Sequence, residues 1–168
     1  MYEPSDVTRT EAQHLSTSVV VIGAGQAGLA AAFFLTRAGL VPGEDLLVLD
    51  AGPRTGGAWQ HRWESLRLGD THKVHDLPGM HEMGLTFADA PRDRPARDVV
   101  AAYYAMYERH HNLKVVRPAR VQTVERDDHG YLLRLEPGGG LGDRVGPNPG
   151  ERDRDVDSPP DPGDAGPS

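Results

Sequence analysis

The stretch VVVIGAGQAG, residues 19–28, decides how this chain folds. Its first four residues are apolar and β-branched, which is typical of a buried strand. This strand runs directly into a Gly-x-Gly-x-x-Gly turn formed by Gly23, Gly25 and Gly28. Residues 26–37 are rich in helix formers and end shortly before Gly39. The stretch therefore predicts a strand, a tight turn and a helix.

A second apolar strand completes the pattern. Residues 46–49 read LLVL and lead into Asp50, twenty-two residues after Gly28. This spacing is that of a dinucleotide-binding βαβ unit. We expect Gly23 to permit the turn, Gly25 to let backbone approach a pyrophosphate, and Gly28 to pack the helix against the sheet.

Two parts of this unit would hold a dinucleotide. The helix N-terminus offers unpaired amides and the positive end of its dipole to phosphates. Asp50 stands where a carboxylate would accept hydrogen bonds from adenosine ribose hydroxyls, and an acid there favours FAD or NAD over NADP. A glycine trio alone would be equally typical of a surface loop, but the flanking strand and helix favour a nucleotide site.

Composition excludes several classes of function. The length of 168 residues suits one domain, and an apolar content of 38% can form a core. The net charge of −7 argues against a nucleic-acid partner, and the lack of cysteine excludes a Cys-x-x-Cys redox pair. Residues 1–17 lack a signal-peptide core, and the apolar run 29–35 is too short to cross a bilayer. We therefore expect a soluble, cytoplasmic protein with no membrane partner.

The composition also divides the chain into three parts. We expect a flexible leader over residues 1–16 and a folded domain over residues 17–136. In residues 137–168, Gly and Pro make up 15 of 32 positions. Such a segment cannot bury enough apolar surface to offset its ordering entropy, so we expect a disordered tail.

The middle of the chain continues the α/β pattern. The glycines of the loop AGPRTGGAW, residues 51–59, would let backbone pass close to a second part of a large cofactor. Beyond this loop the patterns predict a turn at 77–80, a helix over 96–111, a third parallel strand over 113–116, and a hairpin of strands 121–125 and 131–135.

No side chain is a strong catalytic or metal-binding candidate. We interpret the helical tyrosines as core residues rather than catalytic acids. The histidine pairs His72/His75 and His110/His111 lack the cysteines or carboxylates that would complete a metal site. Ser65 lacks the context of a nucleophile elbow. The catalytic residues stay unknown, and we expect no metal.

The segments VVVIGAGQAGLAAAFFL, LLVLDAGPRTGGAW and WESLRL together resemble the N-terminal FAD-binding region of flavin-dependent monooxygenases. More broadly, the chain is similar to FAD/NAD(P)-binding oxidoreductases with two dinucleotide-binding domains, over residues 17–136. The resemblance implies a Rossmann-like, three-layer α/β domain with a β-hairpin or meander, and it implies FAD as cofactor. The Gly-Gly-x-Trp segment is more specific for FAD than the first glycine motif.

The resemblance also implies which residues contact the cofactor. The implied contacts run from the pyrophosphate through the adenosine to the flavin end: Gly23, Ala24, Gly25, Gln26, Ala27 and Gly28 at the pyrophosphate; Asp50, Ala51 and Arg54 at the ribose; Val121 at the adenine; and Gly57, Ala58, Trp59, Trp63 and Leu68 towards the flavin.

Two family features are missing from this sequence. No second Gly-x-Gly-x-x-Gly for NADPH follows, and the last strand of the FAD domain is absent. We therefore expect a truncated, incomplete FAD domain, with NADPH and oxygen serving only the intact family. The favoured function is that of a flavin-monooxygenase-like oxidoreductase. An inactive dinucleotide-binding remnant and an NAD-dependent dehydrogenase remain alternatives, although the Gly-Gly-x-Trp segment speaks against the second. Substrate, subtype and oligomeric state are not predicted.

A frameshift would explain the tail. With G+C-rich codons chosen for residues 151–160, reading one base later gives Asn-Ala-Thr-Gly-Thr-Trp-Thr-Arg-Pro. That resembles the Ala-Thr-Gly segment which follows the paired strands in these flavoproteins. We hypothesise an out-of-frame tail, which the gene sequence tests: stop codons in the shifted frame would exclude it.

Overall fold

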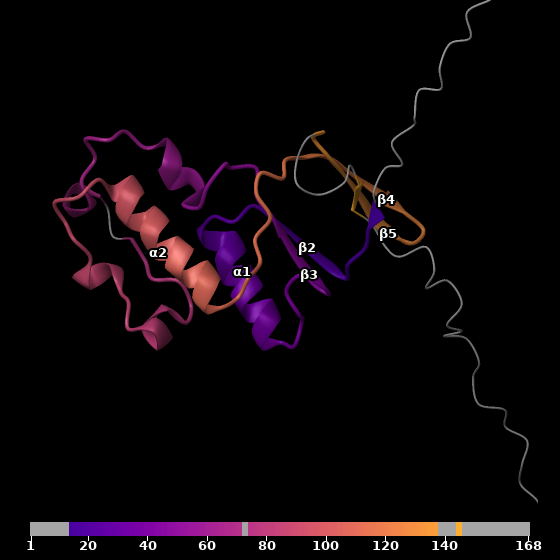
Figure 1. The fold of residues 1–168 in the computed structure, drawn as a ribbon, viewed down its shortest axis with the longest axis horizontal. Helices are drawn as coiled ribbons and strands as arrows, with labels where there is room; N and C mark the ends of the chain where they lie inside the picture. The colour runs from indigo at the N-terminus through magenta and orange to yellow at the C-terminus, as the bar shows by residue number, and fades with distance from the viewer. Residues whose placement is uncertain (1–13, 72–73, 138–143, 146–168) are drawn as a thin grey trace, which may run out of the picture.

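The computed structural model describes residues 14–71, 74–137 and 144–145. Its strands are β1 (His14–Leu15), β2 (Val19–Ile22), β3 (Leu46–Leu49), β4 (Val121–Asp127), β5 (Gly130–Leu135) and β6 (Arg144–Val145). Its helices are α1 (Gln26–Arg37) and α2 (Ala96–His110), with the short 3-10 helices η1 (Gly57–His61), η2 (Leu68–Asp70), η3 (Met80–Met83) and η4 (Phe87–Asp89) between β3 and α2. The fold is α/β, as predicted (Figure 1).

The predicted βαβ unit is confirmed. Strands β2 and β3 pair in parallel from Val19 opposite Leu46 to Ile22 opposite Leu49, and α1 forms the crossover between them. The predicted third strand, residues 113–116, is reduced to one parallel bridge between Val116 and Leu49. Lys114 has a φ of 48°, which takes the backbone out of the extended region and shortens this strand.

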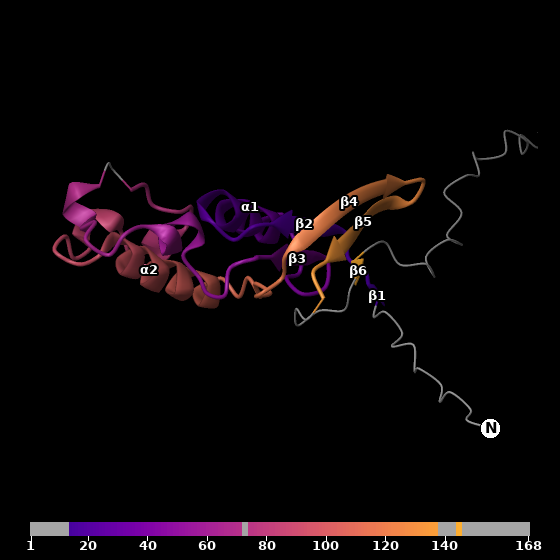
Figure 2. The ribbon, with the colours of Figure 1, turned by 90° about the horizontal axis from the view of Figure 1, so that it is seen from above.

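Alternate residues of β3 face two different apolar clusters. Leu46 and Val48 belong to a helix-side core, which also holds residues of α1 and α2, while Leu47 and Leu49 belong to a hairpin-side core. The helices and the β4–β5 hairpin lie on opposite sides of β2 and β3 (Figures 1 and 2). The domain thus has three layers, because side chains alternate between the two faces of a strand.

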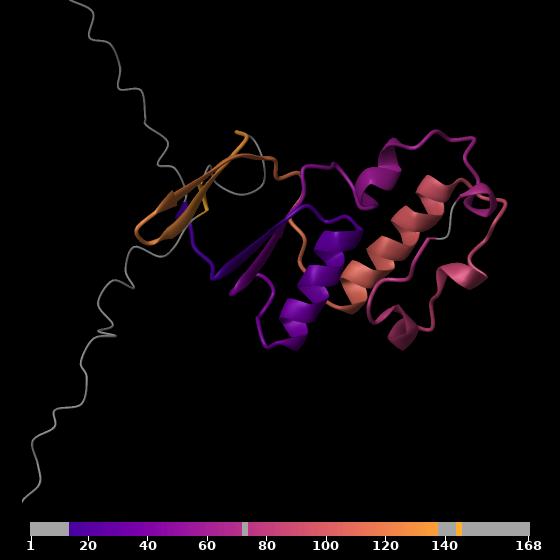
Figure 3. The same cartoon turned by 180° about the vertical axis from the view of Figure 1, so that it is seen from behind.

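The second sheet has the strand order β1-β6-β5-β4. The predicted hairpin is confirmed as the antiparallel pair β4 and β5, and β6 pairs with β5 and with β1. Residues 14–15 and 144–145 form β1 and β6, within segments predicted as leader and tail. The rest of both segments lies outside the described residues. From behind, this sheet stands apart from the helices (Figure 3).

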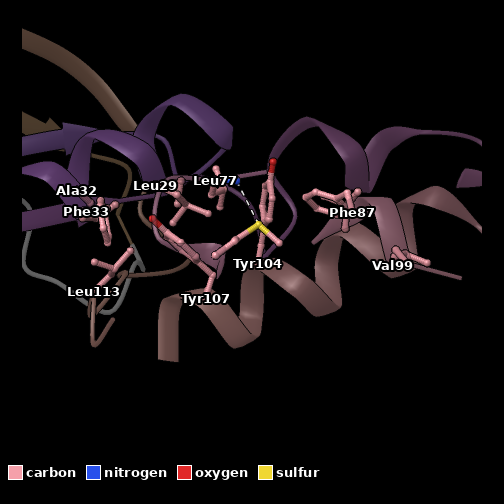
Figure 4. Packing of buried hydrophobic residues seen from close by; sticks show 14 of the residues in the cluster. Leu29, Ala32, Phe33, Leu77, Phe87, Val99, Tyr104, Tyr107 and Leu113 are labelled. Carbon is pink, nitrogen blue, oxygen red and sulfur yellow. Dashed lines mark hydrogen bonds between the residues drawn. The ribbon is translucent and has the colours of Figure 1, made fainter. Parts of the chain in front are cut away.

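Helix α2 contributes tyrosines to the helix-side core, as predicted. Tyr104 and Tyr107 are fully buried and lie among the apolar side chains of Figure 4. The Tyr107 hydroxyl donates a 2.6 Å hydrogen bond to the Pro78 carbonyl. The Tyr104 hydroxyl has no hydrogen-bond partner among the described residues, and burial raises the pKa of Tyr104 to about 12. In the part of the chain that the structure describes, no helix is long and apolar enough to span a membrane.

These two tyrosines form a matched pair for a stability test. Tyr107→Phe should lower the free energy of unfolding by about 1 kcal/mol, because it removes a partly buried hydrogen bond to the Pro78 carbonyl. Tyr104→Phe should be neutral or stabilising, because it removes a hydroxyl that has no partner. Urea unfolding of both variants measures the difference, and a larger loss in Tyr104→Phe would contradict this description of the core.

Candidate dinucleotide-binding site

The glycine turn has the geometry expected from the sequence. Gly23 has a φ of +93°, a region that glycine adopts at little cost, and its amide donates a 2.7 Å hydrogen bond to the Leu49 carbonyl. At Gly28 a Cβ atom would overlap the Gly23 carbonyl oxygen and approach Val21 Cγ1 to 3.4 Å. Turn formation at Gly23 and close packing at Gly28 are therefore confirmed as structural roles.

Helix α1 begins directly after the first two glycines of this turn. Gly25 is the N-cap, with extended backbone and no side-chain cap, and the first turn carries no acidic residue. The first amides of a helix have no partner within the helix. Gln26 and Ala27, the first two residues of the helix, are exposed. This end of α1 is therefore suited to bind an anion.

The loop after β3 passes against the same turn. At Gly57, φ is +51° and an added Cβ would lie 2.7 Å from Gly25 Cα. At Gly56, φ is +117° and a Cβ would lie 3.2 Å from Ala101 Cβ of α2. The two glycines thus let the loop pass between α2 and the glycine turn, where a side chain would not fit.

Asp50 follows directly after β3 and is only 8% exposed, the sole buried polar or charged residue among those described. Its Oδ1 accepts a 3.3 Å hydrogen bond from the Ala24 amide. Its Oδ2 accepts a 2.7 Å hydrogen bond from Nε of Arg117, which also forms an ion pair. The carboxylate predicted to meet the ribose is therefore held beside the glycine turn and paired with an arginine.

Arg117 connects this carboxylate to α2. Its Nη1 and Nη2 each donate a 2.7 Å hydrogen bond to Glu108, whose Oε1 also accepts 2.9 Å from the Thr55 hydroxyl. Burial alone lowers the pKa of Arg117, but the hydrogen bonds with Glu108 and Asp50 outweigh it and raise that pKa above its ordinary value. The arginine therefore stays charged.

Sequence reasoning missed Arg117 and Glu108. A topological signal for Arg117 was available: if residues 113–116 run parallel beside β3, the residue after Val116 lies next to Asp50. The structure bears this out, since Val116 accepts a hydrogen bond from the Asp50 amide at 3.0 Å. For Glu108 the signal was helical spacing, because it lies four residues after Tyr104 and eight after Val100, on the buried face of α2.

The remaining predicted contacts are spread over a wider area. Ala51, half-buried, and Arg54, exposed, follow Asp50, and Ala58 is exposed in η1. Trp59 packs against the helix-side core and Val121 against the hairpin-side core, whereas Trp63 is 63% exposed and Leu68 is buried in the helix-side core. Their contact with a cofactor stays a prediction.

A separate cavity of about 710 Å³ lies beside η2 and η4. It is lined by Leu68, Thr71, Val74, His75, Asp76, Thr86, Phe87, Ala88 and Arg92. Of the residues predicted to touch the cofactor, only Leu68 lines it. Within the described ranges, no three histidine, aspartate or glutamate side chains gather closely enough to hold a metal.

The glycine turn, the open helix end and the buried acid define a dinucleotide-binding α/β domain. The profile of the pyridine nucleotide-disulphide oxidoreductase family matches residues 20–138, and the chain belongs to this family. It contains no cysteine, so a redox disulfide within this chain is excluded.

Relatives are flavoenzymes or oxidoreductases of greater length. A flavin-containing monooxygenase from Stenotrophomonas maltophilia is 37% identical with a TM-score of 0.61, and the match covers 78% of this chain and 36% of that one. A CzcO-like oxidoreductase from Geobacillus kaustophilus is 27% identical, over 79% of this chain and 35% of its own length. A polycyclic ketone monooxygenase from Thermothelomyces thermophilus is 28% identical, over 82% and 20% respectively.

The chain thus spans about a third of the length of the first of these relatives. The family and its flavin monooxygenase relatives support FAD as the cofactor of this chain.

The steric role of Gly28 gives a stability prediction. Alanine normally stabilises a helix relative to glycine by up to about 1 kcal/mol. Gly28→Ala should instead lower the free energy of unfolding by about 2 kcal/mol or more, because its Cβ would overlap the Gly23 carbonyl. Ala31→Gly, at an exposed position of the same helix, calibrates the propensity term. Denaturant unfolding that shows Gly28→Ala to be more stable than wild type would contradict the packing described.

Proposed function

We propose that this chain binds FAD and is the FAD-binding part of a flavin-dependent oxidoreductase of the monooxygenase kind. The single observation that carries the proposal is the close approach of the Gly57 backbone to Gly25. It brings the loop after Asp50 against the open N-terminus of α1. A simple mononucleotide site would not need a second glycine loop at this place.

The residues present fit the cofactor. The first amides of α1 would hold the diphosphate, because they have no capping side chain and no acidic neighbour in the first turn. Asp50 would accept a hydrogen bond from the ribose, since each carboxylate oxygen has two lone pairs and uses one of them in the described contacts. The loop 51–59 would lead onward to the flavin.

Bound FAD would supply the redox chemistry, which this chain's side chains do not offer. The task of the chain is then to bind and orient the cofactor. Reduction by NADPH and reaction with oxygen belong to the intact family and remain proposals for any longer protein. We also propose a cytoplasmic location and a small-molecule substrate, and the net charge of −7 supports the lack of a nucleic-acid partner.

An absorbance spectrum tests the proposal. The protein refolded with excess FAD and freed of unbound cofactor by gel filtration should show the two visible flavin bands. FMN lacks the adenosine half of FAD. It should be removed from the protein by the same gel filtration, because the proposed site binds the diphosphate and the adenosine ribose. A colourless protein would overturn the proposal. Flavin-free binding of NAD would then favour the dehydrogenase, and binding of neither would favour an inactive remnant.

A substitution at Gly25 should affect cofactor binding much more than folding. An added Cβ there meets no protein atom closer than Gly57 Cα at 3.9 Å, and the backbone is extended. Gly25→Ala should therefore cost less than about 1 kcal/mol of stability. It should weaken FAD binding at least about tenfold, because the methyl group occupies the path of the diphosphate. A fluorescence titration with FAD measures the affinity, and unchanged affinity in a folded variant would place the diphosphate elsewhere.

A further inference from the structure

We propose that Arg117 is a positioning residue for the ribose site: it fixes the Asp50 carboxylate in its binding orientation, and Glu108 of α2 holds Arg117 in place. This inference rests on the proposed function, because it concerns how the same site recognises an adenosine ribose. Neither residue would itself need to touch the nucleotide.

The main chain of Asp50 is fixed without Arg117. Its amide donates to the Val116 carbonyl at 3.0 Å, and its carbonyl accepts from the Ala119 amide at 2.8 Å. The side chain is held differently. Oδ1 has one long contact, 3.3 Å from the Ala24 amide, and Oδ2 has the 2.7 Å bond from Arg117. The short, charge-assisted bond from Arg117 therefore dominates the orientation of the carboxylate.

Arg117 is held more firmly than a surface arginine. Its side chain is 12% exposed, and those of Asp50 and Glu108 are 11% and 14% exposed. The two parallel hydrogen bonds that Arg117 donates to Glu108 fix the plane of the guanidinium, and the hydrogen bond donated by the Thr55 hydroxyl fixes Glu108 in turn. A bidentate pair specifies direction as well as distance. The orientation of Nε towards Asp50 is thus set from α2.

The arrangement also leaves capacity for a ligand. Each carboxylate oxygen can accept two hydrogen bonds, so both oxygens of Asp50 retain a free lone pair beside the glycine turn. Without Arg117, the carboxylate would lose its strongest partner and be free to rotate towards solvent. The expected consequence is a loss of affinity that depends on the ribose hydroxyls and spares the diphosphate contacts.

Calorimetric titration of the full chain with two probes tests this. The probes are ADP and 2′,3′-dideoxy-ADP, which lacks both ribose hydroxyls. Arg117→Met should weaken ADP binding about tenfold and change dideoxy-ADP binding less than about twofold, because only the hydroxyl contact is lost. Arg120→Met is the matched control: Arg120 lies on the same segment, is 62% exposed and pairs with Glu136. It should affect neither ligand.

Two further variants complete the test. Glu108→Gln keeps the bond from Arg117 to Asp50 and removes the charge that holds the guanidinium, so it should give a smaller loss, again for ADP alone. If Arg117→Met fails to fold, the Glu108→Gln variant provides the test instead. In an Asp50→Asn background, Arg117→Met should weaken ADP binding less than about twofold, because the two residues act through one contact.

The outcomes separate this inference from the proposed function. Equal loss of both ligands in Arg117→Met and in Glu108→Gln, or no loss of either, would overturn the positioning role while the wild type still binds ADP and FAD. Full additivity with Asp50→Asn would overturn it too. A wild-type protein that binds neither FAD nor ADP would overturn the proposed function, and the positioning role with it.

Discussion

The buried carboxylate of Asp50 is the point where the parts of this domain meet. It joins the end of β3 to the glycine turn through the Ala24 amide, and to the segment after Val116 through Arg117. Glu108 extends the same network to α2. A charge so little exposed is costly unless it is paired and hydrogen-bonded. Strand, turn and helix must therefore be in place together before this acid is satisfied.

Glycines allow close backbone packing around this charged network. At Gly28 and Gly57 a Cβ atom would meet neighbouring backbone, so these positions bring α1 and the loop 51–59 close to the turn. Steric fit and charge pairing thus converge on the same few residues. The other edge of β2 has no strand beside it: within the described ranges β2 pairs only with β3. Ile22 of β2 and Phe34 of α1 are 56% and 61% exposed.

The βαβ unit, the second helix and the hairpin could be predicted because their signals are local: apolar periodicity, glycine spacing and turn residues. The shortening of the strand at Val116 could not, because it depends on the left-handed φ of Lys114, which no periodicity reveals. The Arg117–Asp50 pair joins positions 67 residues apart. Such a contact follows from the order of strands in the sheet, so it can be inferred only after residues 113–116 are placed beside β3, and not from any local pattern.

Amide NMR shifts during titration with ADP test the central claim, that the glycine turn and Asp50 form the nucleotide site. We predict saturable shifts for the amides of Gly25, Gln26, Ala27 and Asp50 and for the side-chain Nε–H of Arg117. The residues that line the 710 Å³ cavity should remain unchanged. Shifts confined to that cavity, or no shifts at any ADP concentration, would contradict the claim.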